Sequence, residues 1–460
     1  MRVLALSSPI YAHTVNTVPF LEGLAARGAE VHWGVADELR QVAQHAPARR
    51  WDTGPARPFV PSPGRLREVS RRYAWLLEDA AARLAPTLEL ARSLRPDVVL
   101  TDSLGYAAAL GAERLDIPWV SFGDGPLHFP DERTPPFGAG LPYRTPRPWV
   151  WRNNVVQVAS RRGVMGRARS RYAALRRELG LPPGRVPVLE AALSPLLHLH
   201  CGAPELEYPR RALPAHVHFV GALRPPAPEG WERPSWWDEV VGGGAQAAGV
   251  LAGADGGLVL ATQGTLRADP AELLGPVVTV LRQTGRPGVV TTGAGDPAVL
   301  SGPGLVAPRV AVEQFVPYEE ILRHARVMVT NGGWTGSLLA LAHGVPVVQV
   351  GRTEEKADIG RRVEWAGAGI HLPSAGPPED PRRLRRAVDR AAEDPQIRAT
   401  AARIAASLAG RDPGRDGAAL VERAVGGWDQ EAGATGQDTR CDMDGRDTDG
   451  PAEDAGRRGR

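Results

Sequence analysis

Two separate series of short apolar runs alternate with helical segments along this chain, and this pattern restricts the chain to the α/β class of folds. In the first series, residues 3–6 have the composition of a buried strand, and residues 7–14 are expected to form a loop. Apolar residues then recur at helical spacing from Val18 to Ala25, and Gly28 follows as a typical helix-ending glycine. Residues 31–35 begin the next strand, which completes a βαβ unit with an expected right-handed crossover.

The same alternation continues and then restarts after a change in composition. Further strands are predicted at residues 98–100 and 119–122, and a second series at 258–261, 288–292, 327–330 and 347–350. A length of 460 residues suits two domains better than one core. The sequence therefore predicts two doubly wound, Rossmann-like α/β domains in tandem.

Composition marks the expected boundaries. We predict a first domain (1–223), a Pro-, Trp- and Gly-rich connector (224–257), a second domain (258–412), a helix that packs back on the first domain (413–428) and a disordered tail (429–460). The tryptophans of the connector are interpreted as packing between domains rather than as a binding platform. Residues 123–149, rich in proline, glycine and aromatic residues, are expected to form a long functional loop.

Several function classes are disfavoured. Lys+Arg number 55 and Asp+Glu 52, so charge gives no argument for a nucleic-acid partner. Two cysteines make no disulfide framework, and neither a signal peptide nor a run of about 20 apolar residues is evident, so a cytoplasmic protein without an integral membrane segment is expected. No Gly-x-Gly-x-x-Gly turn follows the first strand of either domain, which disfavours a dehydrogenase. His198, His200 and Cys201 are too few for a metal site.

Two residues of the first domain are candidates for proton transfer. His13 and Asp102 each follow a predicted strand, and doubly wound domains bind ligands at the carboxyl ends of their strands. A histidine beside an aspartate is held in one tautomer, which suits it to accept a proton from an alcohol. Spacing alone leaves open that the two residues never meet.

A glycine-rich turn in the second domain is a candidate phosphate site. Residues 331–337, Asn-Gly-Gly-Trp-Thr-Gly-Ser, lie between a predicted strand and an apolar helix. Backbone N–H groups and the helix dipole at such a turn favour a phosphate, and Thr265, after the first strand of the domain, has a hydroxyl to add. A tight turn without a ligand remains the alternative.

Four motifs follow one another in the second domain: Gln314-Phe315-Val316-Pro317-Tyr318, Thr330-Asn331-Gly332-Gly333-Trp334, Ala342-His343-Gly344-Val345-Pro346 and Glu354-Glu355-Lys356. The first domain adds Ala12-His13 and the run from Pro96 to Asp102. With these motifs the chain resembles the family 1 glycosyltransferases (UDP-glycosyltransferase superfamily) of the GT-B fold, in the bacterial antibiotic- or macrolide-type branch, from Met1 to about Val425.

The resemblance implies an inverting, metal-independent transfer of a sugar from a dTDP- or UDP-sugar to a hydroxyl of a small lipophilic natural product, with no cofactor. His13 matches the base and Asp102 its acidic partner. The base and ribose of the donor are expected along residues 315–318, the pyrophosphate at 331–337 and the sugar hydroxyls at 355–356. The implied donor-binding residues are Thr265, Gln314, Phe315, Val316, Tyr318, Asn331, Gly333, Trp334, Thr335, Gly336, Ser337, Glu355 and Lys356.

Some positions depart from the family pattern. Asn331 replaces a histidine, and Thr335-Gly336 an Asn-Ser pair. Leu339 replaces a ribose-binding glutamate, which favours a dTDP-sugar over a UDP-sugar. Lys356, the single lysine of the chain, replaces a glutamine. A compact ammonium there could bind a sugar hydroxyl or a phosphate, and an arginine is not an equivalent replacement for it.

Two other functions stay open at this point. The altered phosphate motif is compatible with a sugar-nucleotide-binding auxiliary protein without turnover, and nucleotide-sugar epimerases share the two-domain fold. The expected partners are a nucleotide-sugar and a small acceptor, and the sequence leaves the oligomeric state open.

Overall fold

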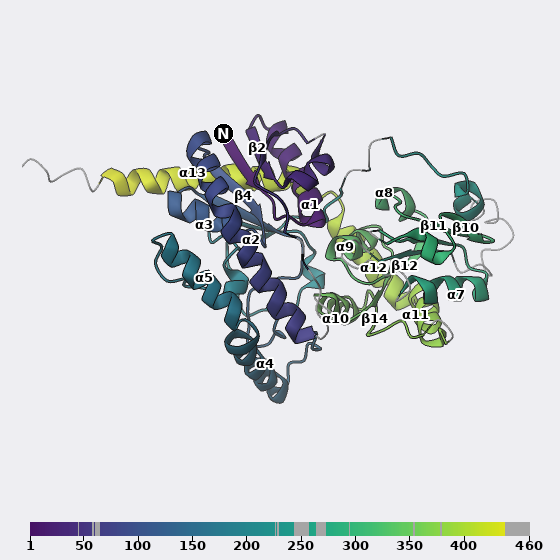
Figure 1. Cartoon of the computed structure of the whole chain (residues 1–460). Coiled ribbons are helices and arrows are strands. Elements are labelled where there is room, and N and C mark those ends of the chain that lie inside the picture. The colour runs from purple at the N-terminus through teal and green to yellow at the C-terminus, as the bar shows by residue number, and fades with distance from the viewer. Residues whose placement is uncertain are drawn as a thin grey trace, which may run out of the picture.

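The computed structural model describes residues 1–44, 46–57, 59, 65–225, 227, 230–242, 257–263, 273–293, 295–352, 355–377 and 380–437. Two α/β domains lie side by side, each around a parallel sheet with helices on its faces (Figure 1). The predicted fold class is confirmed. Thr265, part of the connector and residues 438–460 lie outside the described part of the chain.

The first domain has a seven-stranded parallel sheet in the order β3-β2-β1-β4-β5-β6-β7. Its central strands are apolar and buried on both faces, as parallel sheets require. The strands are β1 (Arg2–Leu6), β2 (Glu30–Val35), β3 (Arg49–Asp52), β4 (Val98–Asp102), β5 (Trp119–Gly123), β6 (His198–His200) and β7 (Val217–Phe219). The helices are α1 (Tyr11–Ala26), α2 (Arg65–Leu94), α3 (Tyr106–Leu115), α4 (Arg147–Ala159) and α5 (Gly166–Glu178), with a π-helical turn at Ser160–Val164.

The second domain repeats the plan with the order β10-β11-β9-β8-β12-β13-β14, in which β10 is antiparallel to β11. Its strands are β8 (Leu258–Thr262), β9 (Gly288–Thr291), β10 (Gly304–Ala307), β11 (Val310–Glu313), β12 (Ala325–Thr330), β13 (Val347–Val350) and β14 (Gly369–Leu372). Its helices are α7 (Leu274–Thr284), α8 (Tyr318–Ile321), α9 (Trp334–Ala342), α10 (Lys356–Ala366), α11 (Arg382–Glu393) and α12 (Pro395–Leu408).

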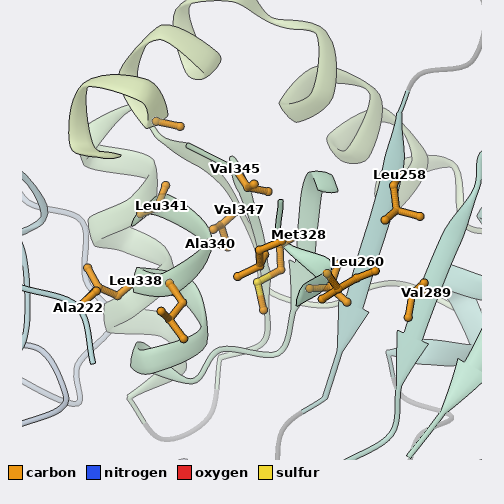
Figure 2. Packing of buried hydrophobic residues seen from close by; sticks show 14 of the residues in the cluster. Ala222, Leu258, Leu260, Val289, Met328, Leu338, Ala340, Leu341, Val345 and Val347 are labelled. Carbon is orange, nitrogen blue, oxygen red and sulfur yellow. The ribbon is translucent and has the colours of Figure 1, made fainter. Parts of the chain in front are cut away.

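One core of the second domain contains Leu338 and Leu341 of α9 together with Met328 and Leu260 of the strands (Figure 2). Ala222, from the end of the first domain, and the stacked Trp236 and Trp237 belong to the same core. The connector tryptophans therefore pack into the second domain, in agreement with their interpretation as packing residues.

The last helix, α13 (Pro413–Gln437), crosses back to the first domain and lies along α1 (Figure 1). Gly414 at its start touches the backbone of α1 so closely that a Cβ there would collide with the Pro19 carbonyl. Ala418, Val421 and Val425 then complete the core beside β1. The helix extends to Gln437, into the residues from 429 for which disorder was expected.

Among the described helices, none combines the length and apolar character needed to cross a membrane.

Candidate active site

His13 lies in the first turn of α1, which begins at Tyr11. The expected loop to residue 14 is therefore shorter than predicted. The helix start could not be seen in the sequence because its N-cap residue, Ile10, has no polar side chain to mark it. A helix fixes the direction of the imidazole more firmly than a loop would.

Asp102 meets His13 as the spacing suggested. It ends β4, which pairs with β1, and its Oδ1 lies 3.2 Å from His13 Nδ1. The carboxylate is fully buried and accepts hydrogen bonds from the Ser8 N–H (2.6 Å), the Ser8 hydroxyl (2.8 Å) and the Leu104 N–H (2.9 Å). These donors and His13 outweigh burial, which opposes ionisation, so the pKa of Asp102 is lowered.

A second carboxylate, which the sequence analysis missed, flanks the same imidazole nitrogen. Asp124 directly follows β5, and its Oδ1 lies 3.3 Å from His13 Nδ1. Its other oxygen accepts a hydrogen bond from Asn16 Nδ2 at 2.8 Å. The signal was present in the sequence, since residues 119–122 were predicted as a strand of the same sheet and Asp124 stands just beyond its carboxyl end.

The two carboxylates change the proton affinity of His13. Burial lowers the pKa of the imidazole, but Asp124, Asp102 and, more weakly, Glu355 of the second domain outweigh it and raise the pKa to about 9. His13 is therefore an imidazolium at neutral pH in the unliganded protein. Nδ1 is at ion-pair distance from both carboxylates, although its angles satisfy a hydrogen bond to neither.

The glycine-rich turn of the second domain joins β12 to α9. Gly332 has a φ of +98°, and a Cβ at this position would collide with the Gln349 side chain, so any side chain here would be strained. Gly333 is the N-cap of α9 and supplies no side-chain cap, so the first N–H groups of the helix are not capped by a side chain. The turn thus has the geometry expected of a phosphate site.

The turn lies directly against the His13 network. Asn16 Nδ2, which donates to Asp124, also lies 3.0 Å from the Thr335 hydroxyl oxygen at the start of α9. A chain of contacts therefore runs from His13 through Asp124 and Asn16 to Thr335. The structure brings the candidate base of one domain and the candidate phosphate turn of the other to the same place.

The other predicted donor residues are placed unequally. Gln314 and Phe315 are exposed, Asn331 and Glu355 are half-buried, and Lys356 is buried at the start of α10. Val316 belongs to the core, and the Tyr318 hydroxyl lies 3.3 Å from the Thr262 hydroxyl oxygen. Any contact that the buried Val316 makes with a donor is thereby limited to backbone atoms, whereas the Tyr318 ring is only partly buried.

Within α9, two more side chains form hydrogen bonds inside the protein. The Trp334 indole is buried and donates to the Cys201 carbonyl of the first domain at 2.6 Å, so it fastens the domains together. The Ser337 hydroxyl donates back to the Gly333 carbonyl at 2.9 Å. Thr335 is therefore the hydroxyl of this turn that remains close to the candidate base.

Helix α10 fastens the loop at residues 123–149 to the second domain. Asp358 accepts hydrogen bonds from the N–H groups of Gly138 (2.7 Å) and Gly140 (2.8 Å). One turn further, Arg362 forms a buried ion pair with Glu207 of the first domain at 3.2 Å. Sequence reasoning did not find these contacts, which join residues 155 to 220 positions apart.

Two facing doubly wound domains, with a histidine and two carboxylates on one and a glycine-rich helix start on the other, define a two-domain enzyme of the GT-B fold. Residues 296–416 match the family described as erythromycin biosynthesis protein CIII-like, C-terminal domain. The chain is 34% identical over 437 residues to 4'-demethylrebeccamycin synthase of Lentzea aerocolonigenes, covering 92% of this chain and 99% of that protein.

Solved structures show the same fold. The calicheamicin glycosyltransferase CalG4 has a TM-score of 0.68 at 21% identity, covering 92% of this chain and 98% of that one. The glycosyltransferase VinC in complex with dTDP has a TM-score of 0.63 at 18% identity, covering 92% and 99%. The chain belongs to the family 1 glycosyltransferases, in their antibiotic-type branch, and the predicted family and enzyme class are confirmed.

Proposed function

We propose that this glycosyltransferase moves a sugar, with inversion and without a metal, from a dTDP- or UDP-sugar to a hydroxyl of a lipophilic natural product. The observation that carries the proposal is the position of His13. Its Nδ1 lies between Asp102 and Asp124, and the same network contacts Thr335 at the glycine-rich turn.

In the proposed reaction, the acceptor oxygen attacks the anomeric carbon from the face opposite the diphosphate. The bond from that carbon to the diphosphate oxygen breaks, and its electron pair leaves with the diphosphate. The hydroxyl proton goes to His13 Nε2, because Nδ1 is the nitrogen that faces the carboxylates. Asp102 and Asp124 then stabilise the imidazolium that forms.

The donor half of the proposal is supported by the start of α9. A diphosphate that gains negative charge as its bond breaks is stabilised by uncapped N–H groups and the helix dipole, which need no metal. Leu339 is fully buried in the core, so no carboxylate reaches a ribose from that position. This, together with the dTDP complex of VinC, favours a dTDP-sugar.

The acceptor half rests on the loop at residues 123–149, here called the acceptor loop. It begins at the carboxyl end of β5, next to Asp124, and is rich in proline, glycine and aromatic residues. Loops at the strand ends of such domains commonly supply the contacts to a small ligand. The relative that makes 4'-demethylrebeccamycin is named for a natural product.

The test combines a panel of dTDP- and UDP-sugars with lipophilic alcohols, and measures nucleotide release and the anomeric configuration of the product. We expect an inverted product, undiminished rates in EDTA, and a fall of about 100- to 10,000-fold in kcat for His13→Ala with donor binding retained by calorimetry. Transfer by His13→Ala at the wild-type rate contradicts the base assignment. A retained anomeric configuration contradicts the single displacement.

A further inference from the structure

Residues 144–177, here called the arginine arm, contain ten arginines and no aspartate or glutamate. They comprise α4, the π-helical turn and α5 up to Arg177, and Glu178 at the end of α5 lies just outside the arm. The rest of the chain holds 45 basic against 52 acidic residues, so positive charge is concentrated in this one segment although the whole chain is almost balanced. Such segregation creates a local positive potential.

Much of this charge is not neutralised within the protein. Arg171 and Arg176 form ion pairs with Glu78 and Glu113, and Arg161 lies 3.8 Å from Glu190. The exposed side chains of another four arginines have no carboxylate within 4.0 Å among the described residues: Arg147, Arg162, Arg167 and Arg169. These four guanidinium groups face solvent from both helices and from the turn between them.

An apolar stripe runs along the same arm. Trp151, Val155 and Val158 stand four and three positions apart, so they share one face of α4. Trp151 is 70% exposed, Val155 46% and Val158 48%. A short helix gains most of its stability by burying an apolar face, yet Asn153 is the one buried residue of α4. Within the described part of the chain, the stripe therefore lacks the partner that such a face ordinarily has.

The arm is held firmly at its base. Met165, Ala168, Tyr172 and Leu175 pack in a core with α2. By contrast, α4 is joined to the loop at 123–149 by polar contacts, in which Asn153 donates to the Arg133 carbonyl at 3.1 Å. Helix α4 lies at the far end of the first domain, away from α13 (Figure 1). A rigid base thus presents an exposed, basic and apolar helix next to the expected acceptor loop.

We propose that the arginine arm binds the surface of a membrane that contains anionic phospholipids. Arginines attract the lipid phosphates, while a tryptophan and two valines on one helix face insert at the level of the headgroups. Charge complementarity and the exposed stripe together favour a lipid surface. A nucleic acid would use the arginines but would leave the stripe in water.

The test is co-sedimentation of the full chain with vesicles of phosphatidylcholine alone, or of phosphatidylcholine with about one third phosphatidylglycerol. The second composition gives the vesicle surface the negative charge that arginines would bind. We expect binding to the anionic vesicles alone, and its loss at high salt. Arg162→Gln with Arg167→Gln should weaken binding by roughly 25-fold, at about five-fold for each arginine. Trp151→Ser with Val155→Ser should also weaken it.

Matched controls are Arg383→Gln with Arg386→Gln, two exposed arginines of α11 in the second domain, which should leave binding unchanged. Circular dichroism and transferase activity in solution establish that each variant is folded. No binding to anionic vesicles, or equal binding by arm and control variants, overturns the proposal. The proposal is also overturned if the protein binds random duplex DNA but not vesicles, and if the arginine variant weakens that DNA binding while the Trp151 variant leaves it unchanged.

Discussion

Replacing Asp124 by asparagine tests how the site sets the proton affinity of its base. The change keeps the size of the side chain and removes one of two negative charges that lie 3.2 and 3.3 Å from His13 Nδ1. A single opposite charge at this range raises a pKa by about one to three. From a starting value of about 9, the Asp124→Asn variant should therefore have a His13 pKa of roughly 6 to 8.

The sign of the effect on the rate follows from the proton that His13 must accept. With a pKa of about 9, roughly 1% of the imidazole is neutral at pH 7, so kcat/KM of the wild type rises with pH up to about 9. In the variant the rise should come at lower pH. Above pH 9 the variant should be slower, because a weaker base accepts the proton less readily and its imidazolium has lost one stabilising charge. The two profiles are expected to cross.

The assay is kcat/KM for nucleotide release between pH 6 and 10, which reports ionisations of the free enzyme. Asp37→Asn is the matched control, since it also removes one carboxylate from the first domain, but at an exposed position paired with Arg40. The reasoning is refuted if kcat/KM of Asp124→Asn rises with pH over the same range as in the wild type. It is also refuted if the rise shifts equally in the Asp37→Asn control.

Three further predictions concern stability and positioning. Burial raises the pKa of Glu190 from 4.5 to about 7, so its ionised form destabilises the fold. This penalty is absent below about pH 4.5 and complete above pH 7. Glu190→Gln should therefore raise the free energy of unfolding, measured by urea denaturation, by roughly 2–3 kcal/mol at pH 8 but little at pH 4.5. Gly332→Ala forces both a left-handed backbone and a collision with Gln349, and should lower stability by about 1–3 kcal/mol and weaken dTDP binding by calorimetry. Asp358→Asn should raise the acceptor KM by roughly 10-fold with donor binding unchanged, because two N–H groups of the acceptor loop lose a charged acceptor; an unchanged KM would show that the loop holds its place without Asp358.

The parts of the fold that could be predicted are those fixed by local pattern. The strand at residues 347–350 is observed at its predicted bounds, and Gly28 follows α1 with a positive φ. Both features depend on the burial and backbone conformation of a few adjacent residues, so a short stretch of sequence is enough to predict them. The edge strand β3 is largely exposed and carries no apolar run, so it was missed.

The candidate site divides along the same line. His13 and Asp102 were predicted to meet because each follows a predicted strand of the first domain, and the structure brings them together because β1 and β4 are neighbours. Asp124 stands just beyond a predicted strand in the same way and could have been included, but its contact with His13 depends on the sheet order, in which β5 pairs with β4. Trp334 shows the opposite limit: its motif marks the right turn, but its side chain points into the first domain.

Helix α10 links the two halves of the proposed reaction. It begins at Lys356, next to Glu355, where the sugar is expected, and within two turns it holds the acceptor loop through Asp358 and the first domain through Arg362. These positions are rigid with respect to one another because they share one helix. The expected place of the sugar and the backbone of the acceptor loop are therefore set by the same element. A change of acceptor loop that loses the two hydrogen bonds to Asp358 would shift the acceptor relative to the sugar, whatever side chains the new loop provides.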